Sequence, residues 1–156
     1  MKKYFLIFAI VFCLNVFYTN EVYTQETPTI IHETMKAGNK TLKYREERID
    51  NYSKSTITIP SSSLDEAYDI LKEYYDTNNR QDVYYKIGRL IEIFGQLNPV
   101  INNNDVIDMA MATIFMHKSS DTNLVFDMQD SETGSLWSYT MDHQGNETIL
   151  TIVWTD

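Results

Sequence analysis

Polar and apolar residues alternate near the start of the chain, and this period of two predicts β-strands. Residues 41–46 alternate in this way, residues 29–35 are also expected to form a strand, and the turn sequence Ala-Gly-Asn-Lys lies between the two. Gly and Asn tolerate positive φ, so this segment is expected to be a hairpin. A β-branched run over residues 55–60, closed by Pro60, predicts a third short strand.

The last third of the chain predicts a three-stranded meander. Alternating apolar residues occur in three runs, and the segments between them have the composition of turns. Trp137 and Tyr139 are expected on the same face as the apolar residues of the neighbouring strands. That face is either core or, if nothing covers it, a binding surface. The three runs cover residues 124–128, 137–141 and 150–154.

The middle of the chain predicts two helices. Ser63, with Glu66 three residues later, has the pattern of a capping box and marks the start of the first helix. A second stripe of apolar residues begins at Val83 and stops before Pro99, because the residue preceding a proline disfavours helix. Gly88 inside this second helix costs roughly 1 kcal/mol relative to alanine, which predicts a close neighbouring backbone.

Residues 105–117 fit either a buried helix or a strand, and helix is preferred because the run is long and rich in Ala and Met. Strands, then helices, then strands predict an α+β fold. We expect an antiparallel sheet, made of an N-terminal hairpin and a C-terminal three-stranded meander, packed against two or three central helices. A single domain is expected over residues 25–156.

Residues 1–24 have the pattern of a secretory signal peptide. A basic start precedes an apolar run over residues 4–17, which is shorter than the roughly 20 residues that cross a bilayer. Cleavage after Thr24 is preferred to retention of the segment as an anchor, and also to lipidation at Cys13, which follows a large residue. Removal of Cys13 would leave a domain without disulfides, which favours a bacterial periplasmic or secreted protein.

Charge is distributed unevenly along the chain. Residues 25–156 hold 11 basic and 21 acidic residues, a net charge of −10, so binding to nucleic acid or to an anionic membrane through a general positive field is not expected. Residues 36–54 hold six basic residues against three acidic ones. After Lys118 there are seven acidic residues and no Lys or Arg. Such asymmetry indicates either an electrostatic partner or acidic side chains that simply solubilise strand faces and loops.

No catalytic or metal-binding pattern stands out in the sequence. His32, His117 and His143 lack the spacing of a zinc motif, and residues 130–134 lack the spacing of a calcium loop. There is no nucleophile elbow, phosphate-binding loop or dinucleotide fingerprint. We therefore expect no enzyme, no cofactor and no bound metal.

Export, small size and the acidic C-terminal strands favour a binding protein that neutralises a protein partner. Examples are an immunity protein against a toxin and an inhibitor of a hydrolase. A basic partner would be steered towards the acidic residues, with the two aromatic residues as anchors if their face is open. The expected partner-binding residues are Asp127, Asp130, Glu132, Trp137, Tyr139, Asp142 and Glu147.

The alternative function is an envelope ligand-binding module for a small molecule or a glycan. It requires a pocket between the helices and the sheet, because ligand sites are concave and largely apolar. A third hypothesis, a hydrolase, requires two carboxylates that converge in a cleft. The residues expected to line the pocket of a ligand-binding module include Tyr84, Phe94, Met111 and Trp137.

Overall fold

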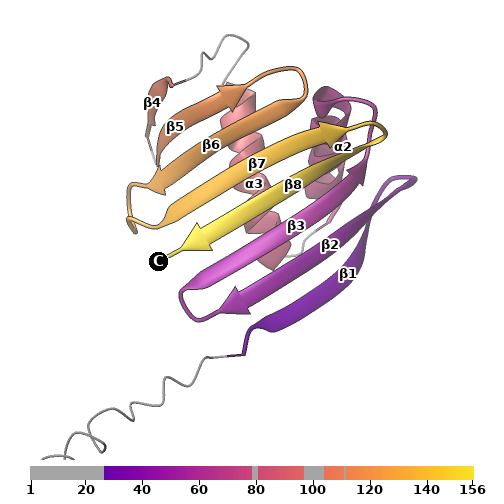
Figure 1. Ribbon diagram of the computed structural model, residues 1–156, viewed down its shortest axis with the longest axis horizontal. Coiled ribbons are helices and arrows are strands. Elements are labelled where there is room, and N and C mark those ends of the chain that lie inside the picture. Colours follow the sequence, from indigo (N-terminus) through magenta and orange to yellow (C-terminus); the bar gives the residue numbers. More distant parts are fainter. Residues whose placement is uncertain (1–26, 79–80, 97–103, 111) are drawn as a thin grey trace, which may run out of the picture.

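The computed structural model describes residues 27–78, 81–96, 104–110 and 112–156. Within these ranges, eight strands form one sheet, and two helices lie against one of its faces (Figure 1). The expected α+β architecture is wrong, because the described part of the chain is mostly strand: its antiparallel sheet has eight strands, more than the expected hairpin and meander supply, and only two helices accompany it. The opposite face of the sheet has no helix or strand of the described residues on it.

All neighbouring strands are antiparallel, and they lie in the order β1-β2-β3-β8-β7-β6-β5-β4. The last strand in the chain therefore lies between β3 and β7 and joins the two halves of the sheet. The strands are β1 (Thr29–Ala37), β2 (Lys40–Ile49), β3 (Tyr52–Pro60), β4 (Val106–Met109), β5 (Ala112–Ser119), β6 (Asn123–Asp130), β7 (Leu136–Gln144) and β8 (Glu147–Thr155).

The helix preferred for residues 105–117 is also wrong, because most of this segment forms β4 and β5 at one edge of the sheet. Ala112, Ile114 and Met116 are buried and alternate with less buried residues. This burial with a period of two, imposed by the packed face, overrides the helical preference of Ala and Met. The register shifts between Met116 and Lys118, so β5 contains a β-bulge there.

The two helices are α2 (Leu64–Thr77) and α3 (Gln81–Gln96). The predicted start of the first helix is confirmed, because Ser63 is its N-cap and its Oγ accepts a hydrogen bond from the Glu66 backbone N–H at 3.1 Å. The Glu66 carboxylate accepts hydrogen bonds from the Ser62 N–H and Oγ at 2.7 and 2.6 Å. The second arm of the expected capping box is thus displaced by one residue.

The core lies between the helices and the sheet. The stripe predicted on the first helix includes Ala67, Leu71 and Tyr74, which are buried, and the second helix buries Val83 and Leu90. A Cβ built on Gly88 would lie 2.8 Å from the Tyr75 ring. The close neighbour predicted for Gly88 is therefore an aromatic side chain and not a backbone.

The predicted signal segment, residues 1–24 with Cys13, lies outside the described residues. Neither described helix is both long enough and apolar enough to cross a bilayer. Export and localisation therefore stay predictions.

Candidate functional site

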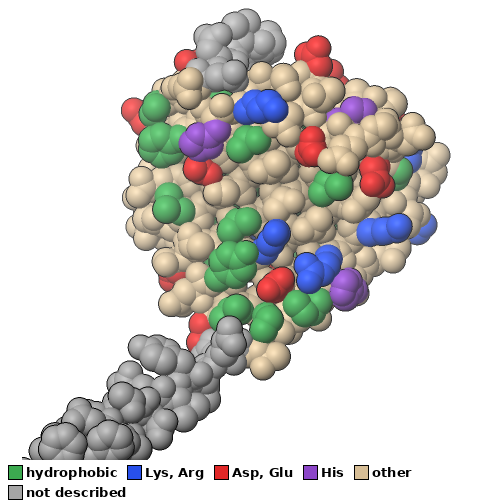
Figure 2. Space-filling view, in the orientation of Figure 1, with side chains coloured by type: hydrophobic (Ala, Val, Ile, Leu, Met, Phe, Trp, Pro, Cys, Tyr) green, Lys and Arg blue, Asp and Glu red, His purple; other side chains and the backbone are tan. Residues whose placement is uncertain are grey.

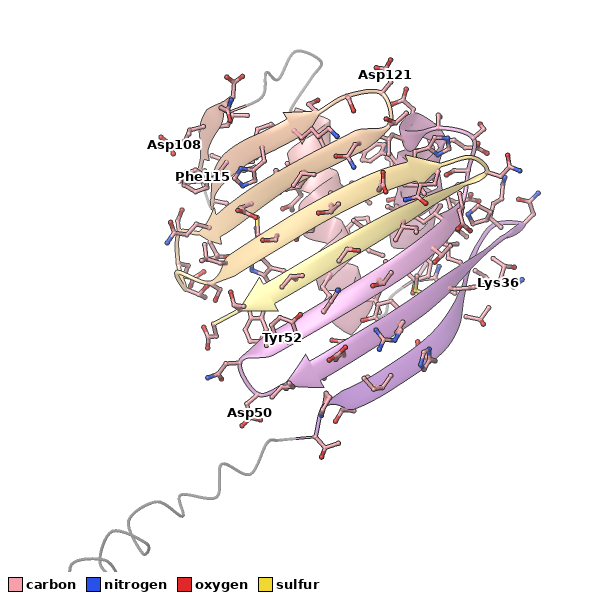
Figure 3. The ribbon with its side chains drawn as sticks, viewed as in Figure 1. Lys36, Asp50, Tyr52, Asp108, Phe115 and Asp121 are labelled. Carbon is pink, nitrogen blue, oxygen red and sulfur yellow. The ribbon has the colours of Figure 1, made fainter. Side chains whose placement is uncertain are left out.

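Four neighbouring strands each place one residue in a row across the helix-covered face of the sheet. The register pairs Arg48 of β2 with Ser53 of β3, and Trp154 of β8 with Trp137 of β7. Ser53 also lies opposite Trp154, which joins the two pairs. Directly opposed residues of antiparallel strands project from the same face. The row lies at the end of the sheet marked by Asp50 in the β2–β3 turn (Figure 3).

A buried ion pair lies next to this row. Glu46, two residues before Arg48 on the same face, is only 1% exposed. Its carboxylate accepts hydrogen bonds from Lys86 Nζ at 2.7 Å, from Tyr44 Oη at 2.8 Å and from Arg48 Nη2 at 3.0 Å. Lys86 projects from α3 and also donates to Ser55 Oγ at 2.8 Å. The pair thus fastens α3 to β2 and β3.

These contacts keep Glu46 ionised. Burial alone would raise the pKa of Glu46, but hydrogen bonds from Lys86 and Tyr44, the charge of Lys86 and a hydrogen bond from Arg48 together outweigh it and hold this pKa below its ordinary value. At neutral pH the carboxylate therefore accepts hydrogen bonds and has no proton to give to a ligand.

A pocket of about 290 Å³ opens beside this ion pair. This volume is close to the lower end of small-molecule sites, which run from about 300 to 1,000 Å³. The rings of Trp137 and Trp154 lie 6.1 Å apart between centroids and are inclined by 47°. The pocket is lined by Glu46, Arg48, Asp50, Ser53, Lys86, Trp137 and Trp154.

Arg48 lines both this pocket and a second hollow. The second hollow has a volume of about 430 Å³, shares Arg48 and Asp50 with the first, and extends to Thr27, Thr29 and Ile49. The side chain of Arg48 is half exposed, and its Nη1 has no hydrogen-bond partner among the residues that the structure describes. Arg48 can thus donate to a molecule in either hollow.

The charges that line the pocket balance. Arg48 and Lys86 supply two cations, and Glu46 and Asp50 supply two anions. Within the described ranges, no group of three or more His, Cys, Asp or Glu side chains could hold a metal ion. The site therefore combines two aromatic rings with both donors and acceptors, and it has no net charge.

The two aromatic residues expected as anchors lie on the helix-covered face, which is core. Tyr139 is fully buried, stacks on Phe126 with 4.9 Å between ring centroids, and donates a hydrogen bond to the Lys86 carbonyl at 3.4 Å. Trp137 is 7% exposed and lines the pocket. Both residues were expected to anchor a partner only if this face is open, and the face is covered.

The expected acidic residues do not form one surface. Asp130 is 5% exposed and is the last residue of β6, where the β6–β7 turn begins. Hydrogen bonds from the Thr133 and Glu132 backbone N–H groups and the charge of Arg89 outweigh burial and lower the pKa of Asp130. Glu132 lies in the same turn, whereas Glu147 begins β8 at the far end of β7. The length of β7 thus separates Glu132 from Glu147.

Asp127 and Asp142 do share a surface, the uncovered face of the sheet, which Figure 2 shows. Asp127 accepts a hydrogen bond from Ser138 Oγ at 2.5 Å and pairs with His117 Nε2 at 2.7 Å. A catalytic triad places the histidine between the serine and the carboxylate. Here the carboxylate lies between the other two groups, so the arrangement does not activate the serine.

Sequence reasoning found one wall of the pocket and missed the others. Trp137 was expected in a pocket and lines one, whereas Met111 and the side chains of Tyr84 and Phe94 lie outside the described residues. The sequence signal for a polar site was Glu46, because it follows Leu42 and Tyr44 at the next buried position of β2. A carboxylate at a buried position requires a partner.

Comparisons with known protein families, with curated proteins and with solved structures found no match for this chain.

Proposed function

We propose that this protein binds a small, neutral, polyhydroxylated ring, such as a sugar unit, in the pocket between α3 and the sheet. One observation carries the proposal. Both tryptophans of the chain line a hollow of about 290 Å³ beside two cations and two anions. This corresponds to the ligand-binding module predicted as the alternative from the sequence.

The composition of the pocket supports this class of ligand. Indole rings offer flat apolar surfaces against which one face of a sugar ring can pack. The hydroxyl groups of a sugar both donate and accept, so they match a site with guanidinium, ammonium, carboxylate and hydroxyl groups together. A phosphate would be attracted by Arg48 but repelled by Asp50, so the balanced charges favour a neutral ligand.

Binding is better supported than catalysis at this site. Glu46 is ionised, and three side chains already donate to it, so it does not resemble a general acid poised for proton transfer. Because residues 1–24 have the pattern of a secretory signal peptide, we also propose that binding takes place in the periplasm or outside the cell of a bacterium.

Tryptophan fluorescence provides a direct test, because the only two tryptophans of the chain both line the pocket. Residues 25–156 would be titrated with a panel of neutral mono- and disaccharides, and with inorganic phosphate as a charged comparison. We expect at least one neutral sugar to change the emission with saturation. The variant Arg48→Ala should weaken this binding by about tenfold or more, since it removes a charged hydrogen-bond donor.

Arg45→Ala is the matched control, because Arg45 lies on the same strand but on the opposite face. It should leave the affinity unchanged. A panel in which no sugar changes the fluorescence would contradict the proposal, and so would equal losses of affinity in the two arginine variants.

The neutralisation of a protein partner stays a prediction from the charge pattern. The observation in its favour is that Asp127 and Asp142 lie on the same uncovered face. Replacing both by asparagine should slow association with a basic partner and reduce its dependence on salt. If neither changes, these residues have no such role.

A further inference from the structure

The uncovered face of the sheet is divided into two halves of opposite charge. On β1–β3 this face carries four basic residues and one acidic residue, a net charge of +3. On the other five strands it carries four acidic residues and one basic residue, a net charge of −3. The first group is Lys36, Lys43, Arg45, Glu47 and Lys54; the second is Asp108, Lys118, Asp127, Asp142 and Glu147.

Figure 2 shows this division on the surface, with Lys and Arg side chains gathered over β1–β3. The middle of the face carries short side chains, because Thr56, Thr151 and Thr140 oppose one another across β3, β8 and β7. Val125 continues this line onto β6, and Val153 lies in the neighbouring row on β8; both are partly buried and add apolar surface. Another sheet can therefore approach the middle of this face closely.

We propose that this face binds a second copy of the same chain, with the two sheets stacked about a two-fold axis that runs along the strands between β8 and β7. Such an axis places β1–β3 of each copy, with a net charge of +3 on this face, over β6, β5 and β4 of the other, where Asp108, Lys118 and Asp127 give a net charge of −1. The same register places Arg45 opposite Lys118, which is one like-charged contact within this arrangement. Each charge contact is then made twice, as an isologous interface requires.

Lys54 and Asp127 form the central contact of this arrangement. The register aligns Lys54 with Val153, Val153 with Ser138, and Ser138 with Asp127, so all four lie in one row. β3 and β6 are equally distant from the proposed axis. Lys54 of each copy therefore lies opposite Asp127 of the other.

The size of the face is adequate for a specific dimer. Eight strands spaced by about 4.8 Å, each with about eight residues at about 3.4 Å, give roughly 1,000 Å² per copy. The total of about 2,000 Å² lies at the upper end of standard protein interfaces. The pocket beside Arg48 opens on the other face, so the two proposals fail independently.

The test is sedimentation velocity on residues 25–156, which retain every described helix and strand. We expect a dimer at low salt whose dissociation constant rises with salt. The variants Lys54→Glu and Asp127→Lys should each weaken the dimer by about tenfold or more, because each places like charges opposite one another twice. An equimolar mixture of the two variants should dimerise again, since every reversed charge then meets its opposite.

Lys72→Glu, on the exposed side of α2, is the control and should leave the dimer intact. Circular dichroism would establish that each variant is folded. A monomer at all concentrations overturns the proposal, and so does a dimer that is insensitive to both face variants. Failure of the mixture to dimerise would overturn the proposed axis and with it this mode of pairing. A monomer that captures a different, basic protein would assign the face to a heterologous partner instead.

Discussion

Glu46 and Lys86 place two opposite charges among the buried side chains that join α3 to the sheet. Isolated buried charges are costly, and a buried pair is tolerated only when its hydrogen bonds are satisfied. Glu46 meets this condition through Lys86, Tyr44 and Arg48. Removing one partner should therefore cost more stability than the intact pair contributes.

Lys86→Met should lower the free energy of unfolding by about 3–5 kcal/mol, because it leaves Glu46 buried without its main counter-charge. Urea denaturation followed by circular dichroism measures the change. Lys72→Met, at an exposed position on α2, is the control and should stay within about 0.5 kcal/mol of the parent protein. The double variant Glu46→Gln/Lys86→Met should recover part of the loss. Equal stability of the two lysine variants would show that the ion pair contributes nothing.

Gly88 and Tyr75 control how closely the two helices approach. The absent side chain of Gly88 leaves room for the Tyr75 ring, which would lie 2.8 Å from a Cβ at that position. Glycine costs a helix roughly 1 kcal/mol, so this close packing offsets a local penalty. The sequence pattern identified the penalty but not the side chain that explains it.

The effect of Gly88→Ala on the free energy of unfolding should therefore have opposite signs with and without the Tyr75 ring. In the parent protein it should destabilise by about 1–3 kcal/mol, because the new methyl group displaces the Tyr75 ring. In a Tyr75→Ala background the same change should stabilise by up to about 1 kcal/mol through helix propensity alone. Thermal or urea denaturation of the four proteins gives the coupling. Equal effects in both backgrounds would mean that Tyr75 does not limit the approach.

Local patterns predicted individual elements well where one short-range signal dominated. Ser63 marked the start of α2, and Gly38 adopts the positive φ of 52° expected in the first hairpin. The segment of β4 and β5 was misread because Ala110, Ile114 and their neighbours fit both periods. Only packing against the rest of the sheet selects the period of two there, and that packing is not local information.

At the scale of the molecule, carboxylates in three places link stability to pH. Hydrogen bonds from Ser62 and Lys40 lower the pKa of Glu66 to about 2, and the pKa values of Glu46 and Asp130 are also lowered. Groups whose folded pKa is depressed stabilise the protein above the unfolded pKa, near 4, and lose this contribution as the pH falls through the folded value.

Stability should therefore be nearly constant from pH 7 to about 5 and should fall between about pH 4.5 and 2. Urea midpoints measured across this range test the prediction. Glu66→Gln should be less stable than the parent protein at neutral pH, and the difference should vanish by about pH 2, where the parent carboxyl is also protonated. A difference that persists unchanged at pH 2 would mean that the charge of Glu66 is not responsible.

The strand order of the whole sheet could not be predicted from local sequence patterns, because its central pair of strands joins segments that are distant in the chain. Ile57 lies opposite Leu150, and no turn between adjacent strands sets that register. The row of Arg48, Trp154 and Trp137 exists only because β8 lies between β3 and β7. The sequence could therefore indicate a buried polar residue and an aromatic strand, but not that they line one pocket.

The central place of β8 also governs how the fold is completed during synthesis. Until β8 emerges from the ribosome, β1–β3 and β4–β7 can form only two separate sheets, each with an unpaired inner edge. Such edges invite pairing with other chains. A nascent or prematurely terminated chain thus exposes two unpaired strand edges to other chains until residues 147–155 pair with both.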